Sequence, residues 1–221
     1  MSRKDVASVV SGAGWIGSFS GFLIDDLEEL GIPAEEIHKL GKPTKEGRSL
    51  VRACAEKIAE MVNGIKSKFL KLISAGKSLV IAEVDGAETL ANANDTFMWI
   101  DKDFVNYGAD QKGPATGKTP VNVYEMVEDA TYSQMFGSLS SDLRKLCLTQ
   151  AQIKSFVRNH KDWLRTDGCA TFFLFESNGH FFVAVVSFYS DGSLYVHVSR
   201  FEYASVWYAE RRPRLVVPKL A

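Results

Sequence analysis

The sequence predicts an α+β protein, in which a helical N-terminal segment is followed by helices packed on a C-terminal antiparallel β-meander. The strongest observation is the stretch 169–217, which is dense in β-branched and aromatic residues and is interrupted by Asn178-Gly179 and Asp191-Gly192. Stretches with helical spacing of apolar residues precede it. The regular alternation of strands and helices that a parallel α/β sheet needs is missing.

Length and composition set the outer limits of the prediction. A chain of 221 residues fits one domain with a small appendage, and we expect a helical module at 1–64 and an α+β domain at 65–221. The formal net charge of −1 provides no general attraction for nucleic acid or anionic membranes. No apolar run could span a bilayer, and no signal-peptide layout opens the chain. We therefore expect a soluble, cytoplasmic protein without membrane contacts.

Metal and cofactor signals are weak. The three cysteines, Cys54, Cys147 and Cys169, are far apart and show neither a disulfide framework nor a zinc spacing. The four histidines lie in separate segments. A polar cluster between Asn92 and Asp110 lacks the spacing of a calcium-binding EF-hand loop and is more typical of solvated turns. The expectation is no metal and no cofactor.

The N-terminal part reads as helical. Gly12, Gly14 and Gly17 match G-x-G-x-x-G, but no second strand ending in an acidic residue follows, so we favour a small-residue surface over a dinucleotide site. After Thr44, apolar residues recur at helical spacing until Gly64 can end the helix.

The middle of the chain mixes expected strands and helices. Residues 77–84 read as a strand, and Thr119-Pro120 reads as a capped helix start. A better helix opens at Thr149, where Gln152 completes a capping box.

The two turns of the meander are expected to be two-residue type I′ turns, which would pair Ser177 with His180 and Ser190 with Ser193. Alternation then defines an aliphatic face and a mixed face. The aliphatic face is expected to hold Phe172, Leu174, Val183, Val185, Leu194, Val196 and Val198. The mixed face is expected to hold Thr171, Phe173, Phe175, Phe182, Ala184, Val186, Phe188, Tyr195, His197, Ser199 and Phe201. If the loop at 202–205 has an even number of residues, a fourth strand at 206–211 would add Val206, Tyr208 and Glu210 to the mixed face, with Glu210 opposite His197.

Four stretches also carry a resemblance: TLANANDTFMWIDKDF at 89–104, LCLTQAQIKSFVRNHKDWLRTDGCATFFLF at 146–175, SRFEYASVWYAERRPRLVVPKL at 199–220, and KPTKEGRSLVRACAEKIAEMV at 42–62. The first three resemble an uncharacterised family of hypothetical proteins from candidate-phylum bacteria. The last resembles an N-terminal module that such proteins carry ahead of different C-terminal parts. The resemblance implies a boundary near Gly64 and implies no activity.

The function we favour from the sequence is a binding or assembly module that contacts an unknown protein partner, or a second copy of itself, through the mixed face. This holds only if residues 78–136 leave that face open. The expected binding residues are Phe173, Phe182, Tyr195, His197, Phe201, Tyr208, Arg211 and Arg212.

Two other functions stay open. In a hydrolase, Glu210 would orient His197 as general base, with Ser199 or Tyr208 as nucleophile or acid. In a protein that binds single-stranded nucleic acid, the basic C-terminal segment would contact phosphates while its aromatic residues stack on bases. That segment contains Arg200, Tyr203, Trp207, Tyr208, Arg211, Arg212 and Arg214.

Overall fold

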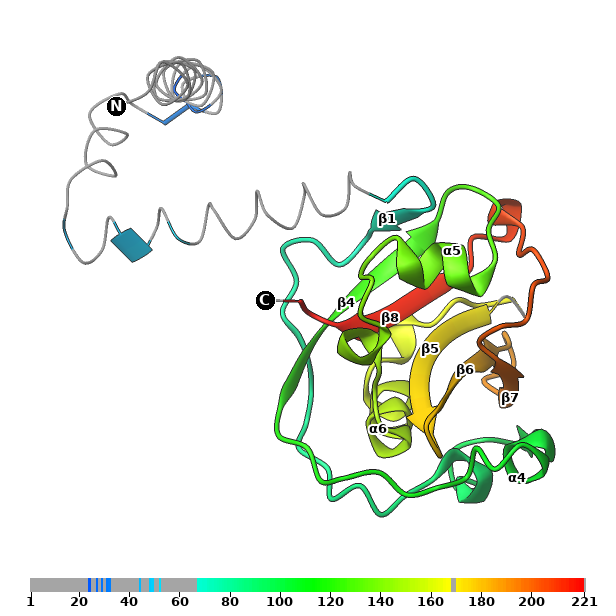
Figure 1. The fold of residues 1–221 in the computed structure, drawn as a ribbon. Helices are drawn as coiled ribbons and strands as arrows, with labels where there is room; N and C mark the ends of the chain where they lie inside the picture. The colour runs from blue at the N-terminus through cyan, green and yellow to red at the C-terminus, as the bar shows by residue number, and fades with distance from the viewer. Residues whose placement is uncertain are drawn as a thin grey trace, which may run out of the picture. The chain divides into compact units, whose positions relative to one another are not determined.

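The computed structural model describes residues 67–167 and 170–220, together with isolated positions between Ile24 and Arg52 (Figure 1). Contacts divide the chain into Met1–Ile58 and Ala59–Ala221. The described positions Ile24, Leu27, Glu29, Arg48, Ser49 and Arg52 are helical. The glycine motif at 12–17 and the expected boundary at Gly64 lie outside the described residues.

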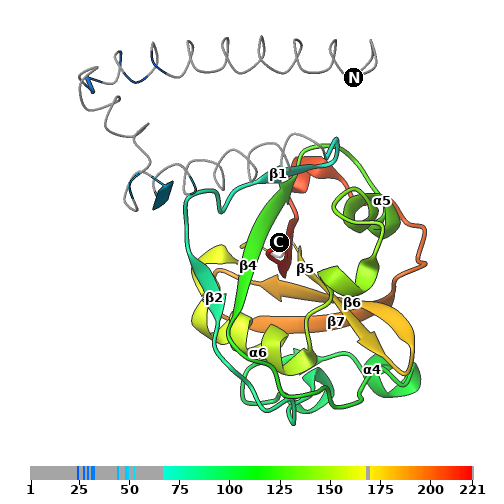
Figure 2. The same cartoon turned by 60° about the vertical axis from the view of Figure 1, so that its left-hand side comes forward.

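The second unit is an α+β fold built on a mixed eight-stranded sheet (Figure 2). Its strands are β1 Leu70–Leu72, β2 Leu79–Ile81, β3 Trp99–Ile100, β4 Thr119–Met126, β5 Ala170–Ser177, β6 His180–Phe188, β7 Leu194–Arg200 and β8 Arg214–Pro218. The order is β1-β4-β8-β5-β6-β7-β3, and β2 pairs with the other half of β4. The predicted antiparallel meander is present as β5-β6-β7, but the β5–β8 and β3–β7 pairs are parallel.

The helices are short and cover both faces of the sheet. They are α4 Asp103–Asn106, α5 Tyr132–Gly137 and α6 Gln150–Asn159, with 3-10 turns η1 Leu90–Asn92, η2 Leu143–Leu146, η3 Lys161–Trp163 and η4 Ala209–Arg211. Figure 1 shows α5 and α6 on opposite sides of the sheet. The best predicted helix is confirmed as α6: Thr149 caps it and forms the capping box with Gln152.

Two hydrophobic cores result. The α6 core contains β2, Leu90, Phe97 and Phe104, together with the β5 and β6 side chains Phe173, Phe175, Phe182, Ala184 and Val186. The α5 core contains Tyr132, Met135 and Phe136, together with Phe172, Leu174, Val183 and Val185. Phe173 and Phe182 are therefore covered by residues 79–109 and by α6, and the face that carries them is not open.

The expected helix after Thr119-Pro120 is wrong, because Thr119–Met126 forms strand β4. This strand lies between β8 on one edge and β1 with β2 on the other. Val121 and Val123 enter the α6 core, whereas Tyr124 and Met126 enter the α5 core. A strand buried on both faces loses the simple polar–apolar alternation, so its sequence imitates helical spacing.

The first hairpin has the predicted register. Ser177 pairs with His180, and Asn178 and Gly179 have φ values of 51° and 76°, as a type I′ turn requires.

The predicted register of the second hairpin is wrong by one residue. Tyr189, not Ser190, faces Ser193: the Tyr189 N–H donates to the Ser193 carbonyl at 3.0 Å. The loop therefore has three residues and only Gly192 has positive φ, at 86°, which matches a type I turn closed by a glycine bulge. Because a shift of one residue turns every side chain over, His197 pairs with Val185 and Ser199 with Val183. The predicted division into an aliphatic and a mixed face is therefore confirmed for β5 and β6, whose two sets of side chains lie in separate cores. It is wrong for β7, because Leu194, Val196 and Val198 join the α6 core and Tyr195, His197 and Ser199 lie on the other side of the sheet.

The predicted fourth strand is also wrong. Residues 206–211 contain an isolated bridge between Trp207 and Ala130 and then the turn η4. The neighbours of β7 in the sheet are β6 and β3, so Glu210 does not face His197 across adjacent strands. The last strand is β8, which lies between β4 and β5.

Candidate functional site: an aromatic shelf on β3 and β7

Large side chains gather at the β3 end of the sheet, on the side that α5 covers elsewhere. We call Met98, Trp99, Tyr189, Tyr195 and His197 the aromatic shelf. Met98 is 77% exposed, Trp99 is 43% exposed and Tyr189 is 38% exposed. Large apolar side chains gathered at the surface are typical of contact surfaces for partners.

The shelf is held together by ring contacts. The Trp99 ring lies 4.5 Å from the His197 ring and 6.5 Å from the Tyr195 ring, and the Tyr189 and Tyr195 rings are 5.1 Å apart. The Tyr195 hydroxyl approaches the Met98 sulfur at 4.0 Å. Each ring is thus held by a neighbour, which reduces the entropy that a partner must remove on binding.

Backbone pairing explains why Trp99 lies here. Phe97 is anchored in the α6 core, and the next residue donates its Met98 N–H to the Leu194 carbonyl at 2.8 Å. Strand β3 then runs parallel to β7, with Trp99 beside Tyr195. The Asp101 N–H donates to the Val196 carbonyl at 3.0 Å and ends the pairing.

A contact between a histidine and an aspartate borders the shelf. His197 Nδ1 lies 3.6 Å from Asp101 Oδ2, and Asp101 Oδ1 accepts a hydrogen bond from the Asp103 N–H at the start of α4. A carboxylate beside Nδ1 is the arrangement that orients a histidine base, but 3.6 Å is longer than a hydrogen bond. Asp101, and not the predicted Glu210, is therefore the acidic neighbour of His197.

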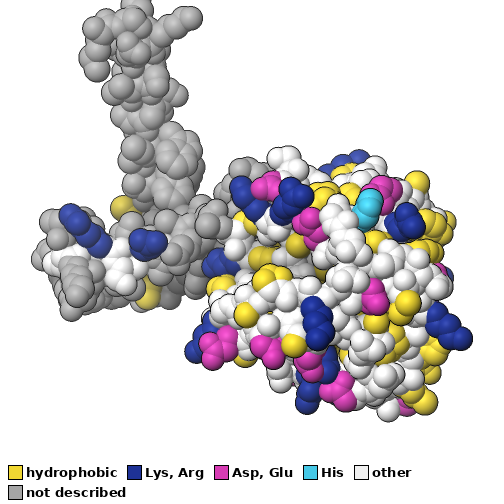
Figure 3. Space-filling view, turned by 60° about the horizontal axis from the view of Figure 1, so that its bottom comes forward, with side chains coloured by type: hydrophobic (Ala, Val, Ile, Leu, Met, Phe, Trp, Pro, Cys, Tyr) yellow, Lys and Arg dark blue, Asp and Glu magenta, His cyan; other side chains and the backbone are white. Residues whose placement is uncertain are grey.

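At the far end of β7, Arg200 lies over the Tyr107 ring, 4.8 Å from its centre. The Asp103 carboxylate raises the pKa of Tyr107 above its ordinary value, and Arg200 acts in the opposite direction. Figure 3, in which the lower side of the molecule that carries α4 comes forward, shows hydrophobic side chains at the surface among charged ones.

The structure separates the residues that the sequence grouped into one site. Tyr195 and His197 belong to the shelf, and Ser199 follows them on the same face but is half-buried. Phe201 packs against the α5 core. Tyr208, Glu210, Arg211 and Arg212 are exposed in and around η4.

Sequence reasoning missed Met98, Trp99 and Tyr189 as members of the site. Trp99 lies in the polar cluster between Asn92 and Asp110, which the sequence favoured as solvated turns. Its place on the sheet depends on a pairing between β3 and β7, which are almost one hundred residues apart, and no local pattern encodes that.

Cys147 is the one thiol in the described ranges. It lines a depression of about 360 Å³ together with Thr149, Gln150 and Glu176. Burial raises the pKa of the Cys147 thiol to about 12, so the reactive thiolate is scarce at neutral pH. This depression lacks an activated nucleophile.

The α5 core contains a buried hydroxyl. Burial raises the pKa of Tyr132 well above its ordinary value, and Ser199 and Trp207 act in the opposite direction. Neither of them stands in hydrogen-bond geometry with the Tyr132 hydroxyl, and the Trp207 Nε1 is likewise buried without a partner. Ser199 therefore lies near a buried phenol but forms no hydrogen bond with it.

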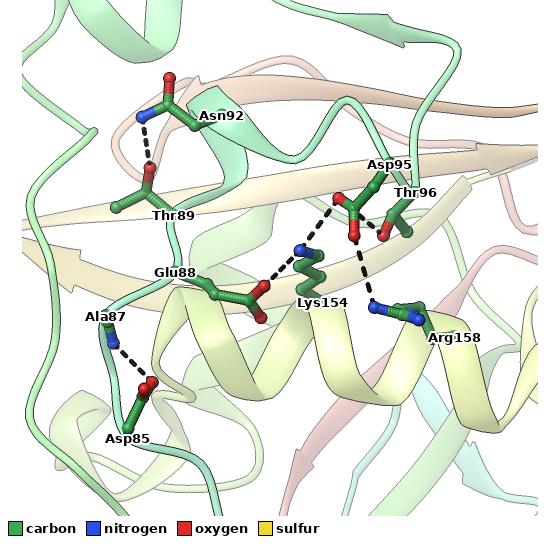
Figure 4. Close-up of polar contacts among 9 residues, drawn as sticks. All are labelled: Asp85, Ala87, Glu88, Thr89, Asn92, Asp95, Thr96, Lys154 and Arg158. Carbon is green, nitrogen blue, oxygen red and sulfur yellow. Dashed lines mark hydrogen bonds and ion pairs between the residues drawn. The ribbon is translucent and has the colours of Figure 1, made fainter.

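A charged group joins Lys154 and Arg158 of α6 to Glu88 and Asp95 (Figure 4). Lys154 reaches between Glu88 and Asp95, with its Nζ 2.9 Å from Asp95 Oδ1, and Arg158 Nη1 lies 3.3 Å from Asp95 Oδ2. Burial by itself would lower the pKa of Lys154, but the two carboxylates outweigh burial and raise it. The group ties the 87–97 segment to α6.

Within the described ranges, no group of three or more His, Cys, Asp or Glu side chains could hold a metal ion. Nor is any helix there long and apolar enough to cross a bilayer. Comparison of the chain with protein-family models, with curated proteins and with solved structures found no match.

Proposed function

We propose that this protein is a binding module that contacts a protein partner through the aromatic shelf. The observation that carries the proposal is the convergence of Met98, Trp99, Tyr189, Tyr195 and His197 at one end of the sheet. They come from β3 and the residue before it, from the β6–β7 loop and from β7, and Met98, Trp99 and Tyr189 are exposed. Tryptophan, tyrosine and methionine are enriched in the centres of protein interfaces, where a few such residues supply most of the binding free energy. The helical N-terminal segment, residues 1–64, belongs to this proposal as a separate module.

A protein is favoured over a small molecule by the form of the surface. The Trp99 and Tyr195 rings are inclined to each other by 52°, and the Trp99 and His197 rings by 43°. Inclined rings make an uneven apolar surface that side chains of a partner can fill. The Asp101 carboxylate at its border favours a partner with a lysine or arginine beside its apolar residues.

Site-specific photo-crosslinking tests the proposal. A benzophenone amino acid at Met98, which is 77% exposed, should yield a discrete crosslinked product in cells that express the protein. The matched control is the same amino acid at Tyr203, which is 56% exposed but lies outside the shelf. The product from position 98 should disappear when Trp99→Ala is added, because loss of a central tryptophan costs about 2 kcal/mol or more, roughly 30-fold in affinity.

A product at twice the chain mass would identify a second copy of the chain as the partner, and another mass would identify a different protein. Equal products from positions 98 and 203, or a product that persists in the Trp99→Ala variant, would contradict the proposal. Circular dichroism of that variant verifies that the fold is retained.

Catalysis by His197 stays a prediction. It is disfavoured because His197 Nδ1 lies 3.6 Å from Asp101 Oδ2, longer than a hydrogen bond, and because Ser199 is half-buried.

A further inference from the structure

A second surface feature is formed by Arg165, Arg211, Arg212 and Arg214, which we call the arginine cluster. Arg165 follows η3, Arg211 ends η4, and Arg214 begins β8. Two hydrogen bonds join these segments: Arg165 Nε donates to the Arg211 carbonyl at 3.1 Å, and Arg214 Nη1 donates to the Leu164 carbonyl at 3.1 Å. Residues nearly fifty positions apart are thereby brought together.

The positive charge of this cluster is not neutralised by ion pairs. Arg165 and Arg214 are fixed by main-chain carbonyls, and in the part of the chain that the structure describes no carboxylate forms an ion pair with any of the four. Burial lowers the pKa of Arg214, the charge of Arg165 lowers it further, and Glu125 on β4 acts in the opposite direction. A guanidinium remains protonated in proteins despite such shifts. Four guanidinium groups without an ion pair therefore gather in a chain whose formal net charge is −1. Their acidic neighbours are Glu125, which is paired in register with Arg214, and Asp129, whose carboxylate accepts the Ala209 N–H of η4.

The cluster also contains N–H groups that no acceptor among the described residues uses. The Nε of Arg214 is buried and has no acceptor. Arg211 and Arg212 are exposed, and Arg212 occupies the left-handed region, with φ 49° and ψ 52°. Glycine is the unstrained residue there, and side chains held in such a conformation concentrate at functional positions.

An exposed aromatic side chain stands beside the cluster. Tyr208 is 57% exposed, and its carbonyl accepts the Arg211 N–H at 3.3 Å, so it belongs to the same turn. We propose that the arginine cluster binds the phosphodiester backbone of single-stranded nucleic acid and that Tyr208 stacks on one of its bases. Guanidinium groups pair with phosphate oxygens, and a base is free to stack on a side chain only when it is unpaired.

The arrangement of the four arginines favours a ligand with several linked phosphates over a single phosphate ion. Arg165 and Arg214 are fixed by backbone, whereas Arg211 and Arg212 project from the turn, so the donors are spread over a surface and do not close around one anion. In the sheet order, β8 is separated from β7 by β5 and β6. The site is therefore distinct from the aromatic shelf, and the two proposals can fail independently.

Fluorescence anisotropy of a labelled oligothymidylate, titrated with the full chain at several salt concentrations, tests this proposal. The Arg211→Gln/Arg212→Gly variant removes two charges and places glycine at the left-handed position, so folding is preserved. If each arginine contacts one phosphate, the slope of log affinity against log salt should fall by about 1.4, and binding at about 0.1 M salt should weaken by at least about tenfold. Tyr208→Ala should weaken binding without changing the salt slope.

Arg200→Gln is the matched control. The sequence grouped Arg200 with the C-terminal arginines, but the structure places this exposed arginine at the end of β7, over Tyr107 and outside the arginine cluster. It should leave both affinity and salt slope near those of the unmodified protein. No anisotropy change at low salt, an equal loss in Arg200→Gln, or equal affinity for duplex DNA of the same length would overturn the proposal. Competition by inorganic phosphate at the same concentration as the oligonucleotide would also overturn it, because it would show a site for an isolated anion.

Discussion

At the scale of single residues, we expect Lys154 to contribute measurably to the free energy of unfolding. Its side chain is only 6% exposed, whereas Glu88 and Asp95 are each 53% exposed. We expect Lys154→Ala to lower the free energy of unfolding by about 1 kcal/mol, less than a fully buried charged hydrogen bond, because water screens the two carboxylates. Lys154→Met keeps the packing of the stem and should cost less. Urea denaturation of the three proteins measures the differences.

The interaction between Lys154 and Asp95 makes the stability of the protein depend on pH, and the pKa shifts of the two groups give the direction. The hydrogen bond from Lys154 lowers the pKa of Asp95 below 3.8, so the stabilisation is present above that pH and is lost as pH falls through the folded-state pKa. The pKa of Lys154 is raised above 10.5, so the stabilisation is also lost at high pH. The stability difference between the unmodified protein and Lys154→Met should be constant between about pH 5 and about pH 9 and shrink outside that window.

A flat pH profile would contradict this account. Lys145→Met is the control, because Lys145 is exposed and its Nζ lies 3.8 Å from Asp142; it should change stability by less than about 0.5 kcal/mol.

At the scale of elements, glycines at turns separate the cost of backbone conformation from the cost of packing. At Gly192, φ is +86° and an added methyl group would meet nothing within 4 Å, so Gly192→Ala should cost about 1 kcal/mol. At Gly86, φ is +77° and the methyl group would lie 2.3 Å from the Gly113 carbonyl oxygen, so Gly86→Ala should cost several times more. Gly137→Ala, with open space and no positive φ, should be neutral or slightly stabilising. Thermal unfolding ranks the three, and equal losses at Gly192 and Gly137 would contradict the turn geometry.

Some elements could be predicted from the sequence and others could not. The capping box of α6 and the Asn178-Gly179 turn were predictable, because each is decided by a few adjacent residues. Asp191-Gly192 was not decisive, since the same dipeptide fits a two-residue turn and a three-residue turn with a bulge. That one residue moved Tyr195, His197 and Ser199 to the other face.

Long-range pairing explains the remaining differences. Strand β4 is fixed by partners on both edges and is buried on both faces, and these outweigh the local signal of Thr119-Pro120. The shelf depends on β3 joining β7. The arginine cluster depends on two hydrogen bonds, one from Arg165 to the Arg211 carbonyl at the end of η4 and one from Arg214 of β8 to the Leu164 carbonyl that follows η3. In all three cases the deciding contact is remote in sequence, so composition and periodicity cannot reveal it.

At the scale of the second unit, one sheet separates two cores, and its central strands belong to both. Phe172 and Phe173 are adjacent on β5 and fully buried, yet Phe172 packs in the α5 core and Phe173 in the α6 core. Loss of either core exposes the same strand, so we expect the two cores to unfold as one cooperative unit. Either alanine substitution should cost about 3–5 kcal/mol.

Two tryptophans allow this to be measured. Trp207 packs against the α5 core and Trp163 against the α6 core. Variants that keep only Trp207 or only Trp163 of the four tryptophans therefore report each side separately. Their urea midpoints should coincide. Phe172→Ala should shift both midpoints equally, although the Phe172 ring lies in the α5 core, 4.7 Å from the Trp207 ring. Separate midpoints, or a shift confined to the Trp207 reporter, would mean that the sheet does not couple its two faces. The shelf and the arginine cluster would then rest on parts that unfold independently.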